Sequence, residues 1–455
     1  MFKKVLIANR GEVAVRVIRA CREIGIPTVA VYSDADADSL HVSLATEAYC
    51  IGPAESAKSY LNIPAIISTA LISGADAIHP GYGFMSERAD FADICAQHGF
   101  AFIGPTAESI RKMGDKAQAR DTMKSKDIPI TPGTDIITDI KAAKKICRKI
   151  GYPVIVKATA GGGGKGMRIV EKEEDLEENI VFCKTEAQRF FGNPAVYIEK
   201  YLVNPRHIEV QILADKFGNV VYLGERDCSI QRRHQKLIEE APSPAVSEKI
   251  REKLGKTAVR VAKAVKYEGV GTVEFLLDKN NDFYFMEMNT RLQVEHGISE
   301  MITNIDIVRE QIRIAAGLPL SITQRDIAIK GHAIECRINA EDPDRNFLPA
   351  AGTITGYIAP GGFGVRVDSH VYSGYKIPPY YDSMISKLMC WAPTREEARR
   401  RMYRALKEYV ITGVKTTLPF YQDLIEDEVF TEGKFDTGFL EDYNKRRAER
   451  NQKNS

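Results

Sequence analysis

Residues 152–170 decide the fold class of this chain. They read Tyr-Pro-Val-Ile-Val-Lys-Ala-Thr-Ala, then Gly-Gly-Gly-Gly-Lys-Gly, then Met-Arg-Ile-Val. The two short apolar runs are rich in β-branched residues and predict two strands joined by a soft tip, as in a β-hairpin. Glycine has no Cβ, so backbone N–H groups in such a tip can turn toward one point. A nest of this kind suits phosphate oxygens, and Lys157 and Lys165 add positive charge at its two ends.

The glycine run is not a P-loop. A P-loop has Ser or Thr after its Gly-Lys pair and continues into a helix, whereas Gly166 follows Lys165 here and a strand comes next. A mobile surface loop is the alternative interpretation, because glycine runs make flexible linkers. The flanking strands and lysines favour phosphate binding. A glycine-tipped hairpin that closes over phosphates resembles the lid of the ATP-grasp superfamily.

Composition limits the class of protein. The chain has 455 residues, of which 44% are hydrophobic and 27% charged, and its net charge is +2. These values predict about three globular domains and no binding to nucleic acid or to a membrane surface. No apolar run reaches the roughly 18 residues of a membrane span, and the apolar run near Met1 is too short for a signal peptide. The eight scattered cysteines contain no Cys-x-x-Cys pair, which fits a cytoplasmic protein without zinc or a disulfide framework.

Residues 1–113 predict one Rossmann-like α/β domain. A strand over 3–8, a helix from Gly11 to about Glu23 and a strand over 27–32 form a βαβ unit, which implies a parallel sheet with a right-handed crossover. Of the dinucleotide-binding glycines only Gly11 is present, so the pattern gives little support for a dinucleotide site. The same alternation continues with a helix near 63–72, a strand at 76–79, a helix after Ser86 and a strand at 100–103.

The rest of the chain predicts a lid domain and a mixed region. Residues 114–203 should hold linker helices, with Lys116 in the first, and the β-hairpin lid. Residues 204–446 should form the ATP-grasp core and a C-terminal domain, and 447–455 a frayed polar tail. The patterns over 204–446 indicate hairpins of 208–213 with 219–224 and 271–277 with 283–289, and helices near 246–266, 305–316 and 394–409.

The second hairpin carries a candidate metal site. If its turn is centred on Asn280-Asn281, Glu274 faces Glu287, with Cβ atoms about 4.5–5.5 Å apart. Asn289 lies two residues on and shares the face of Glu287. Facing carboxylates repel unless a cation lies between them, and an all-oxygen ligand set suits Mg²⁺ or Mn²⁺ with phosphates. A solvated pair on an exposed sheet face is the alternative.

Three further stretches are candidate ligand-binding segments. Arg291, Gln293 and Glu295 alternate, so an extended chain would project them to one side. There an arginine fork can bind an oxyanion and a carboxylate can take a proton; a structural salt-bridge network is the alternative. Residues 224–236 are dense in charge and are either a solvated face or the lining of an anion cleft. The glycine-rich turn 79–84 follows a strand, where ligands of open α/β sheets bind, although an ordinary turn is equally compatible.

Taken together, these motifs resemble biotin carboxylase, the ATP-grasp component of biotin-dependent carboxylases such as acetyl-CoA carboxylase and pyruvate carboxylase. The matching segments are Asn-Arg-Gly-Glu at 9–12, His-Pro-Gly-Tyr-Gly-Phe at 79–84, the lid, Glu-Arg-Asp-Cys-Ser-Ile-Gln-Arg-Arg at 225–233, Glu-Met-Asn-Thr-Arg at 287–291 and Glu-Cys-Arg-Ile-Asn-Ala-Glu at 335–341. The resemblance extends from the first strand to about residue 440. It implies that ATP phosphorylates bicarbonate to carboxyphosphate, which releases CO₂ to N1′ of carrier-bound biotin.

The resemblance also implies roles for individual residues. The expected ATP contacts are Lys116, Lys157, Gly163, Gly164, Met167, Glu199, Lys200, Leu202, His207, Gln231, His234 and Leu276. The expected ligands of two Mg²⁺ or Mn²⁺ ions are Glu274, Glu287 and Asn289, and the expected bicarbonate residues are Lys236, Arg291, Gln293, Val294 and Glu295. The implied catalytic residues are Lys236, Arg291, Glu295 as the base and Arg337 as the stabiliser of the biotin enolate, with Tyr82 near biotin. Arg19, Glu23, Phe363 and Arg366 match positions of the family's homodimer interface.

Some features depart from the family or lie outside its motifs. Gly297 follows Glu295-His296 where the family commonly has proline, and glycine would loosen the segment that bears Glu295. Cys228 is expected to be a small buried hydrophobe, and His41, His98 and His370 are expected to be structural. The Met123-Lys124 pair does not match the Ala-Met-Lys-Met motif of a biotin carrier.

The absence of carrier-like and carboxyltransferase-like segments predicts a stand-alone subunit. Its expected partners are a biotin carboxyl carrier protein and a carboxyltransferase. Two alternatives remain. Another ATP-grasp carboxylate–amine ligase would share the lid and the metal pair but would have no need of Arg337 and the 225–236 motif. A non-catalytic nucleotide-binding regulator would be expected to lose Glu274, Glu287 or Glu295.

The lid interpretation can be tested by substitution. Replacing Gly163 and Gly164 together by valine should impede closure over the phosphates, because β-branched residues restrict the backbone. We expect a higher KM for ATP and a lower kcat in a steady-state ATPase assay. Wild-type values of both constants would contradict a phosphate-binding role for the glycine run.

Overall fold

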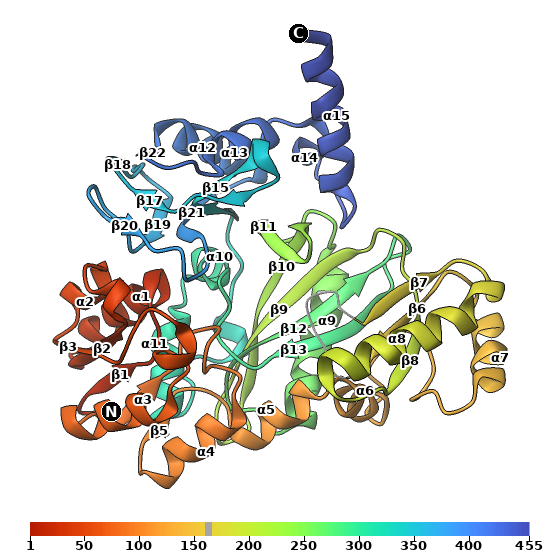
Figure 1. Ribbon diagram of the computed structural model, residues 1–455, viewed down its shortest axis with the longest axis horizontal. Helices are drawn as coiled ribbons and strands as arrows, with labels where there is room; N and C mark the ends of the chain where they lie inside the picture. The colour runs from red at the N-terminus through yellow and green to blue at the C-terminus, as the bar shows by residue number, and fades with distance from the viewer. Residues whose placement is uncertain (160–165, 455) are drawn as a thin grey trace.

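The computed structural model describes residues 1–159 and 166–454 (Figure 1). Its N-terminal part is a parallel sheet in the order β3-β2-β1-β4-β5, so the predicted Rossmann-like layer is confirmed. The strands are β1 (Val5–Ile7), β2 (Thr28–Tyr32), β3 (Glu47–Cys50), β4 (Ala77–His79) and β5 (Ala101–Phe102). The helices are α1 (Gly11–Glu23), α2 (Leu40–Leu44), α3 (Ile63–Ser73), α4 (Ala89–Gln97) and α5 (Ala107–Gly114).

Helix α1 follows directly from its sequence. Val13, Val17 and Ile18 recur at helical spacing and are buried in the core that β1 also joins. Gly25 has φ +74°, a left-handed conformation that glycine adopts without strain, and the chain turns there toward β2. Strand β3 lies outside the sequence-based prediction because it is a half-exposed edge strand with little apolar signal.

The lid is the predicted hairpin with one added strand. Strands β6 (Val154–Ala158) and β7 (Met167–Val170) pair antiparallel, and β8 (Val196–Lys200) pairs with the other side of β6. Helices α6 (Lys116–Lys124), α7 (Ile140–Ile150) and α8 (Leu176–Phe191) complete this part. The hairpin tip, including Gly163 and Gly164, lies outside the described residues.

The remainder is built on an antiparallel sheet in the order β13-β12-β9-β10-β11-β14-β21-β19. Its strands are β9 (Arg206–Ala214), β10 (Val220–Arg232), β11 (Gln235–Ala241), β12 (Gly269–Leu277), β13 (Phe283–Asn289), β14 (His332–Asn339), β19 (Val365–Ser369) and β21 (Met384–Ala392). The helices are α9 (Glu248–Ala264), α10 (His296–Thr303), α11 (Ile307–Ala315), α12 (Arg395–Glu408), α13 (Leu418–Leu424), α14 (Glu428–Thr431) and α15 (Phe439–Asn454). Short strands flank it at β15 (Glu341–Asp342), β16 (Leu348–Pro349), β17 (Gly352–Thr353), β18 (Gly356–Ile358), β20 (Lys376–Ile377) and β22 (Val410–Thr412).

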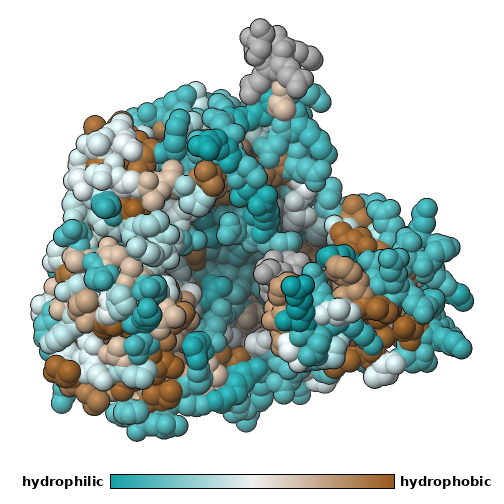
Figure 2. All heavy atoms as spheres, viewed as in Figure 1, coloured by the Kyte–Doolittle hydropathy of each residue, from teal (hydrophilic) through white to brown (hydrophobic). Residues whose placement is uncertain are grey.

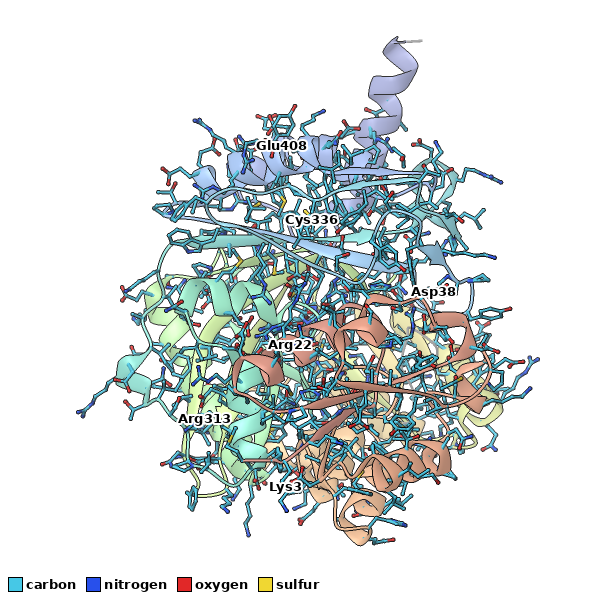
Figure 3. The ribbon with its side chains drawn as sticks, turned by 90° about the vertical axis from the view of Figure 1, so that its left-hand side faces the viewer. Lys3, Arg22, Asp38, Arg313, Cys336 and Glu408 are labelled. Atoms are coloured by element: carbon cyan, nitrogen blue, oxygen red, sulfur yellow. The ribbon has the colours of Figure 1, made fainter. Side chains whose placement is uncertain are left out.

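The β14–β21–β19 end of this sheet lies between two layers. Helix α12 packs on one face, while α10 and α1 pack against the other. Figure 3 shows this sandwich from the side, with Glu408 on α12 above, Cys336 on the sheet, and Arg22 of α1 below. Strand and helix residues of this end share one large apolar core with α13 and the start of α15. The N-terminal part is thereby held against the face of the sheet that carries Arg337 and Lys387.

The C-terminal tail differs from the prediction. It continues as helix α15 to Asn454 and projects from the body of the molecule (Figure 1). Its first turns bury Phe439, Leu440 and Tyr443 in the core, which anchors a helix that the polar sequence alone would not fix. In the described part of the chain, no helix is both long and apolar enough to span a membrane.

Candidate active site

A pocket of about 600 Å³ opens where the N-terminal part, the antiparallel sheet and the β14–β21 region meet. Figure 2 shows a hollow with mostly hydrophilic walls in the middle of the molecule. Sequence-predicted residues from distant segments share this pocket, namely Tyr82, His234, Lys236, Arg291, Gln293, Val294, Glu295 and Arg337. The structure therefore brings the expected bicarbonate and biotin residues together.

Lys236 of β11 lies at the centre of the charged groups. Its Nζ donates to Glu295 Oε1 at 2.7 Å and to Glu209, and it lies 3.4 Å from Glu274 Oε1. Burial opposes its charge, but the surrounding carboxylates Glu209, Glu274 and Glu295 raise the pKa of Lys236 well above its usual value. The Lys236 side chain therefore stays protonated and places a positive charge on the wall of the pocket.

The three carboxylates differ in their protonation. Burial raises the pKa of Glu209 to about 7, with Lys236 opposing the rise. The pKa of Glu295 is instead held well below its usual range, because Lys236, Arg337 and Arg226 outweigh its burial. Lys236 and His207 likewise outweigh burial and lower the pKa of Glu274. Glu295 and Glu274 are thus ionised and can act as a proton acceptor and a cation ligand respectively.

Arg337 of β14 holds the other side of Glu295. It donates from NH2 to Glu295 Oε2 at 2.8 Å and from Nε to Glu239 Oε1 at 2.6 Å. The two oxygens of Glu295 thus face two different cations, Lys236 and Arg337. Each oxygen of Glu295 keeps a further lone pair that can accept a substrate proton.

Two charged residues beneath the pocket, Arg226 and Glu209, were not assigned to the site from the sequence. Arg226 is fully buried and donates to Gln211 Oε1 at 2.7 Å, Glu209 Oε2 at 3.2 Å and Gln293. Glu209 is its partner and also that of Lys236. The alternation of His207, Glu209 and Gln211 within the apolar strand β9 was a usable signal, because it lines one strand face with polar groups.

The carboxylate pair has the predicted register. Glu274 of β12 lies opposite Glu287 of β13, so this prediction is confirmed. The assumed turn centre was wrong, because Leu277 pairs with Phe283 across a loop centred on Asn280. A bulge at Met286 adds one residue to β13 and restores the pairing of the two glutamates.

The pair fits a divalent cation bound with phosphates. Asn289 Nδ2 donates to Glu274 Oε1 at 2.5 Å, and His207 Nε2 lies 2.8 Å from Glu274 Oε2. Glu287 is half-buried, and Lys116 Nζ lies 3.4 Å from its Oε2. Glu274, Glu287 and Asn289 offer only oxygen ligands, which suits Mg²⁺ or Mn²⁺. A cation here would replace N–H donors that now cover the carboxylate oxygens.

Segment 291–295 is not extended throughout as predicted. Val294 and Glu295 form a turn that leads into α10, and Glu295 caps that helix with φ −82° and ψ 12°. Arg291 and Glu295 still line the same pocket, but Arg291 bonds to Glu87 Oε2 at 2.9 Å and Asn289 Oδ1 at 3.0 Å. Glu87, from the N-terminal part, had no sequence signal that separated it from other surface acids.

The remaining expected ATP contacts lie on the lid, just after it, and on strands β10 and β12 of the antiparallel sheet. Lys157 Nζ donates to Glu199 Oε2 at 2.5 Å, and Lys200 Nζ donates to the carbonyls of Gly151 and Tyr152. Gln231 Nε2 lies 3.3 Å from His207 Nδ1. Met167 begins β7, Leu276 is half-buried on β12, and Leu202 follows β8. Gly163 and Gly164 lie outside the described residues.

Gly297 occupies the first turn of α10 beneath Met389. A Cβ at Gly297 would overlap Met389 Sδ, so glycine lets the Met389 thioether lie against the first turn of α10. A residue with a side chain at 297 would require this flexible thioether to move. Cys228, His41 and His370 are buried as expected, whereas His98 ends helix α4 and bonds to the Ile94 carbonyl.

Comparisons with known proteins show the family of this chain. The biotin carboxylase N-terminal domain matches residues 1–110, the carbamoyl-phosphate synthase L chain ATP-binding domain matches 115–323, and the biotin carboxylase C-terminal domain matches 335–442. Biotin carboxylase 1 of Bacillus subtilis is 58% identical over 445 residues, covering 97% of this chain and 99% of that protein. The chain belongs to the biotin carboxylase family. The sequence-based resemblance, the ATP-grasp fold and the assignment as an ATP-dependent ligase are thereby confirmed.

Other members of the biotin carboxylase family are similar over nearly the whole chain. One pyruvate carboxylase subunit of Methanothermobacter thermautotrophicus is 55% identical, with 97% of this chain and 90% of that protein covered. The structure of a biotin carboxylase–β,γ-ATP complex from Campylobacter jejuni superposes with a TM-score of 0.93 at 52% identity, covering 97% and 98% of the chains. The biotin carboxylase domain dimer of Hydrogenobacter thermophilus 2-oxoglutarate carboxylase, with MgADP, ADP and bicarbonate, gives 0.91 at 52% identity, covering 98% of each.

The metal pair generates a direct test. Glu287→Gln should weaken binding of metal–ATP, because a neutral amide balances less of the cation's charge. We expect a rise in the KM for metal–ATP at limiting Mg²⁺ of at least the ~10–100-fold that loss of an outer-shell partner typically causes.

Asp282→Asn is the matched control for this test. It removes one carboxylate from the exposed loop of the same hairpin, away from the pair, and should keep the KM of the unaltered chain. Unchanged kinetics in Glu287→Gln would contradict a metal role for the pair.

Proposed function

We propose that this pocket phosphorylates bicarbonate with ATP to carboxyphosphate, which breaks down to CO₂ and phosphate, and that the CO₂ adds to N1′ of biotin on a separate carrier protein while the phosphate takes the N1′ proton. The observation that carries the proposal is the position of Glu295. Its ionised carboxylate lies between Lys236 and Arg337, in the pocket that also contains Arg291 and Gln293. A base placed among cations and amides suits a small acid that is held and deprotonated in one place.

The bicarbonate side consists of Lys236, Arg291, Gln293, Val294 and Glu295. The cations would hold the anion's oxygens, and Glu295 would take its remaining proton as an oxygen attacks the γ-phosphorus of ATP and ADP leaves. The low pKa of Glu295 depends on Lys236 and Arg337. When Lys236 turns to the substrate oxygens, the carboxylate loses the stabilisation that this cation gives and becomes a stronger base.

The biotin side consists of Arg337 and Tyr82. Arg337 would face the negative charge that develops on the ureido oxygen once N1′ loses its proton, which is stabilisation of the oxyanion type. The Tyr82 hydroxyl donates to Glu12, so that its ring forms a fixed wall of the pocket. This division gives Glu295 and Arg337 different steps of one reaction.

The nucleotide would lie between the lid and the carboxylate pair. The residues assigned to it are Lys116, Lys157, Gly163, Gly164, Met167, Glu199, Lys200, Leu202, His207, Gln231, His234 and Leu276. Glu274, Glu287 and Asn289 would hold two Mg²⁺ or Mn²⁺ ions, which neutralise phosphate charge when bound. Two contacts between the nucleotide residues and the metal residues support this arrangement. Lys116 contacts Glu287, and His207 contacts Glu274.

The proposed assembly is a cytoplasmic homodimer that works with a biotin carboxyl carrier protein and a carboxyltransferase. Arg19, Glu23 and Arg366 line a second pocket of about 460 Å³, and Phe363 is 77% exposed. Arg19 and Glu23 come from α1 and Arg366 from β19, and these two elements pack together, so positions that match the family's interface gather on adjacent elements. The transferase would determine whether acetyl-CoA, pyruvate or another acceptor receives the carboxyl group.

Another ATP-grasp carboxylate–amine ligase is the second candidate. Such an enzyme needs the lid and the carboxylate pair, but it has no ureido oxyanion to stabilise. The match to both biotin carboxylase domains, with relatives similar over nearly the whole chain, favours biotin carboxylation.

Two isosteric variants separate the proposed steps. Glu295→Gln should suppress both biotin-independent ATP cleavage and carboxylation, by the ~10²–10⁴-fold that loss of a general base typically costs. Arg337→Gln should depress biotin carboxylation while it spares the slow bicarbonate-dependent ATPase. The measurement is phosphate release with and without free biotin.

The unaltered chain is the reference in both assays. Retained ATPase activity in Glu295→Gln would show that another group takes the proton. Equal loss of both activities in Arg337→Gln would remove its assignment to the biotin step.

A further inference from the structure

Lys387 of β21 is a fully buried cation at which three distant segments meet. Its Nζ donates to the backbone carbonyl of Val294 at 2.7 Å and lies 3.3 Å from Glu12 Oε2. Val294 precedes the proposed base, Glu12 belongs to the N-terminal helix α1, and Lys387 comes from the C-terminal region. The ammonium therefore connects all three segments that the family models match.

The bond to Val294 acts on the base through the peptide unit. The Val294 carbonyl and the Glu295 N–H belong to the same planar trans peptide and point in opposite directions. Fixing the carbonyl therefore fixes the direction of the Glu295 N–H and the start of its side chain. The carboxylate at the other end is held by Lys236 and Arg337, so Glu295 is restrained from both sides.

The ion pair with Glu12 reaches the other side of the pocket. Glu12 Oε1 accepts from the Tyr82 hydroxyl, and Tyr82 lines the pocket where biotin is proposed to bind. Among the described residues, Lys387 is the cation paired with Glu12. Loss of that cation would leave a buried carboxylate unpaired beneath Tyr82, which is costly.

A further chain of ion pairs connects Lys387 to helix α10. Lys387 Nζ lies 3.8 Å from Asp368 Oδ2, which accepts from Arg366 NH2 at 2.7 Å. Arg366 NH1 donates to Glu300 Oε2 at 2.6 Å. Glu300 lies on α10, the helix that Glu295 caps. The start of α10 is thus held by Lys387, and its later part by Arg366.

We propose that Lys387 is a positioning residue that sets Glu295 and Tyr82 relative to each other by binding the Val294 carbonyl and Glu12 at once. This inference rests on the function proposed above. It assigns to a residue that touches neither substrate the task of aligning the bicarbonate side of the pocket with the biotin side. Displacement of a reacting group by about 1 Å can cost ~10²-fold in rate.

The first variant is Lys387→Met, which removes the charge and keeps the length of the side chain. We expect kcat for bicarbonate-dependent ATP cleavage to fall on the order of 10²-fold and the KM for bicarbonate to rise. The Kd of ADP, measured by calorimetry, should stay unchanged because the nucleotide residues do not contact Lys387.

Arg395→Met is the matched structural control. Arg395 is a largely buried cation bonded to Glu240 at 2.7 and 3.0 Å and to the carbonyls of Phe430 and Thr431, away from the pocket. Its loss should lower the Tm and leave the KM for bicarbonate and the kcat of the folded fraction unchanged. A purely structural role of Lys387 would give the same result in Lys387→Met.

Glu12→Gln separates the effects of the two contacts that Lys387 makes. It keeps the Val294 bond but removes the negative charge beside Tyr82, so the KM for free biotin should change more than ATP cleavage without biotin. If Lys387→Met fails to fold, the double variant Glu12→Gln/Lys387→Met removes the unpaired carboxylate and carries the test. Bicarbonate kinetics of the unaltered chain in either Lys387 variant would overturn the proposal.

The unaltered chain distinguishes this failure from failure of the proposed function. If it shows neither bicarbonate-dependent ATPase activity nor biotin carboxylation, the proposed function is contradicted and the positioning role with it. If it shows both, and Lys387→Met retains the same bicarbonate kinetics, the positioning role alone is contradicted.

Discussion

The site depends on one buried ammonium, that of Lys236. Glu209, Glu274 and Glu295 surround it, and Glu209 and Glu295 are almost wholly inaccessible to solvent. Burying so many charges carries a large desolvation cost, which only close pairing offsets. Each carboxylate must therefore be held close to the lysine with little conformational freedom. The segments that carry these groups must already be in place before any substrate binds.

The antiparallel sheet meets this requirement. Glu209 lies on β9, Glu274 on the adjacent β12, and Lys236 on β11 across β10, so ladder hydrogen bonds set their spacing. Glu295 has no strand to hold it. It caps α10, and its position depends on side-chain bonds from Lys236, Arg337 and, through the peptide before it, Lys387. The groups expected to stay fixed are on strands, whereas the group expected to exchange a proton is at a helix start.

The sequence predicted what local chemistry controls. The positions of Gly11 and Gly25 predicted the two ends of helix α1 to within a residue. The apolar pattern of the 271–289 hairpin predicted that Glu274 lies opposite Glu287. The bulge at Met286 could not be foreseen, because a one-residue insertion leaves no mark in the apolar pattern. Nor could the turn at Val294, which follows from bonds to Lys236, Arg337 and Lys387 rather than from its own residues. The motif resemblance supplied the candidate site residues, and the tertiary fold added Glu87, Glu209 and Arg226 as their partners.

The residues at positions 297 and 389 depend on each other, because they occupy adjoining space. The sulfur of Met389 takes the space that any Cβ at 297 would need. A side chain at 297 would therefore require the Met389 thioether to turn away, or another residue to stand at 389. A chimera that joins the α10 segment of a homologue with proline at 297 to the β21 segment of this chain would have to repack these two side chains where α10 meets β21.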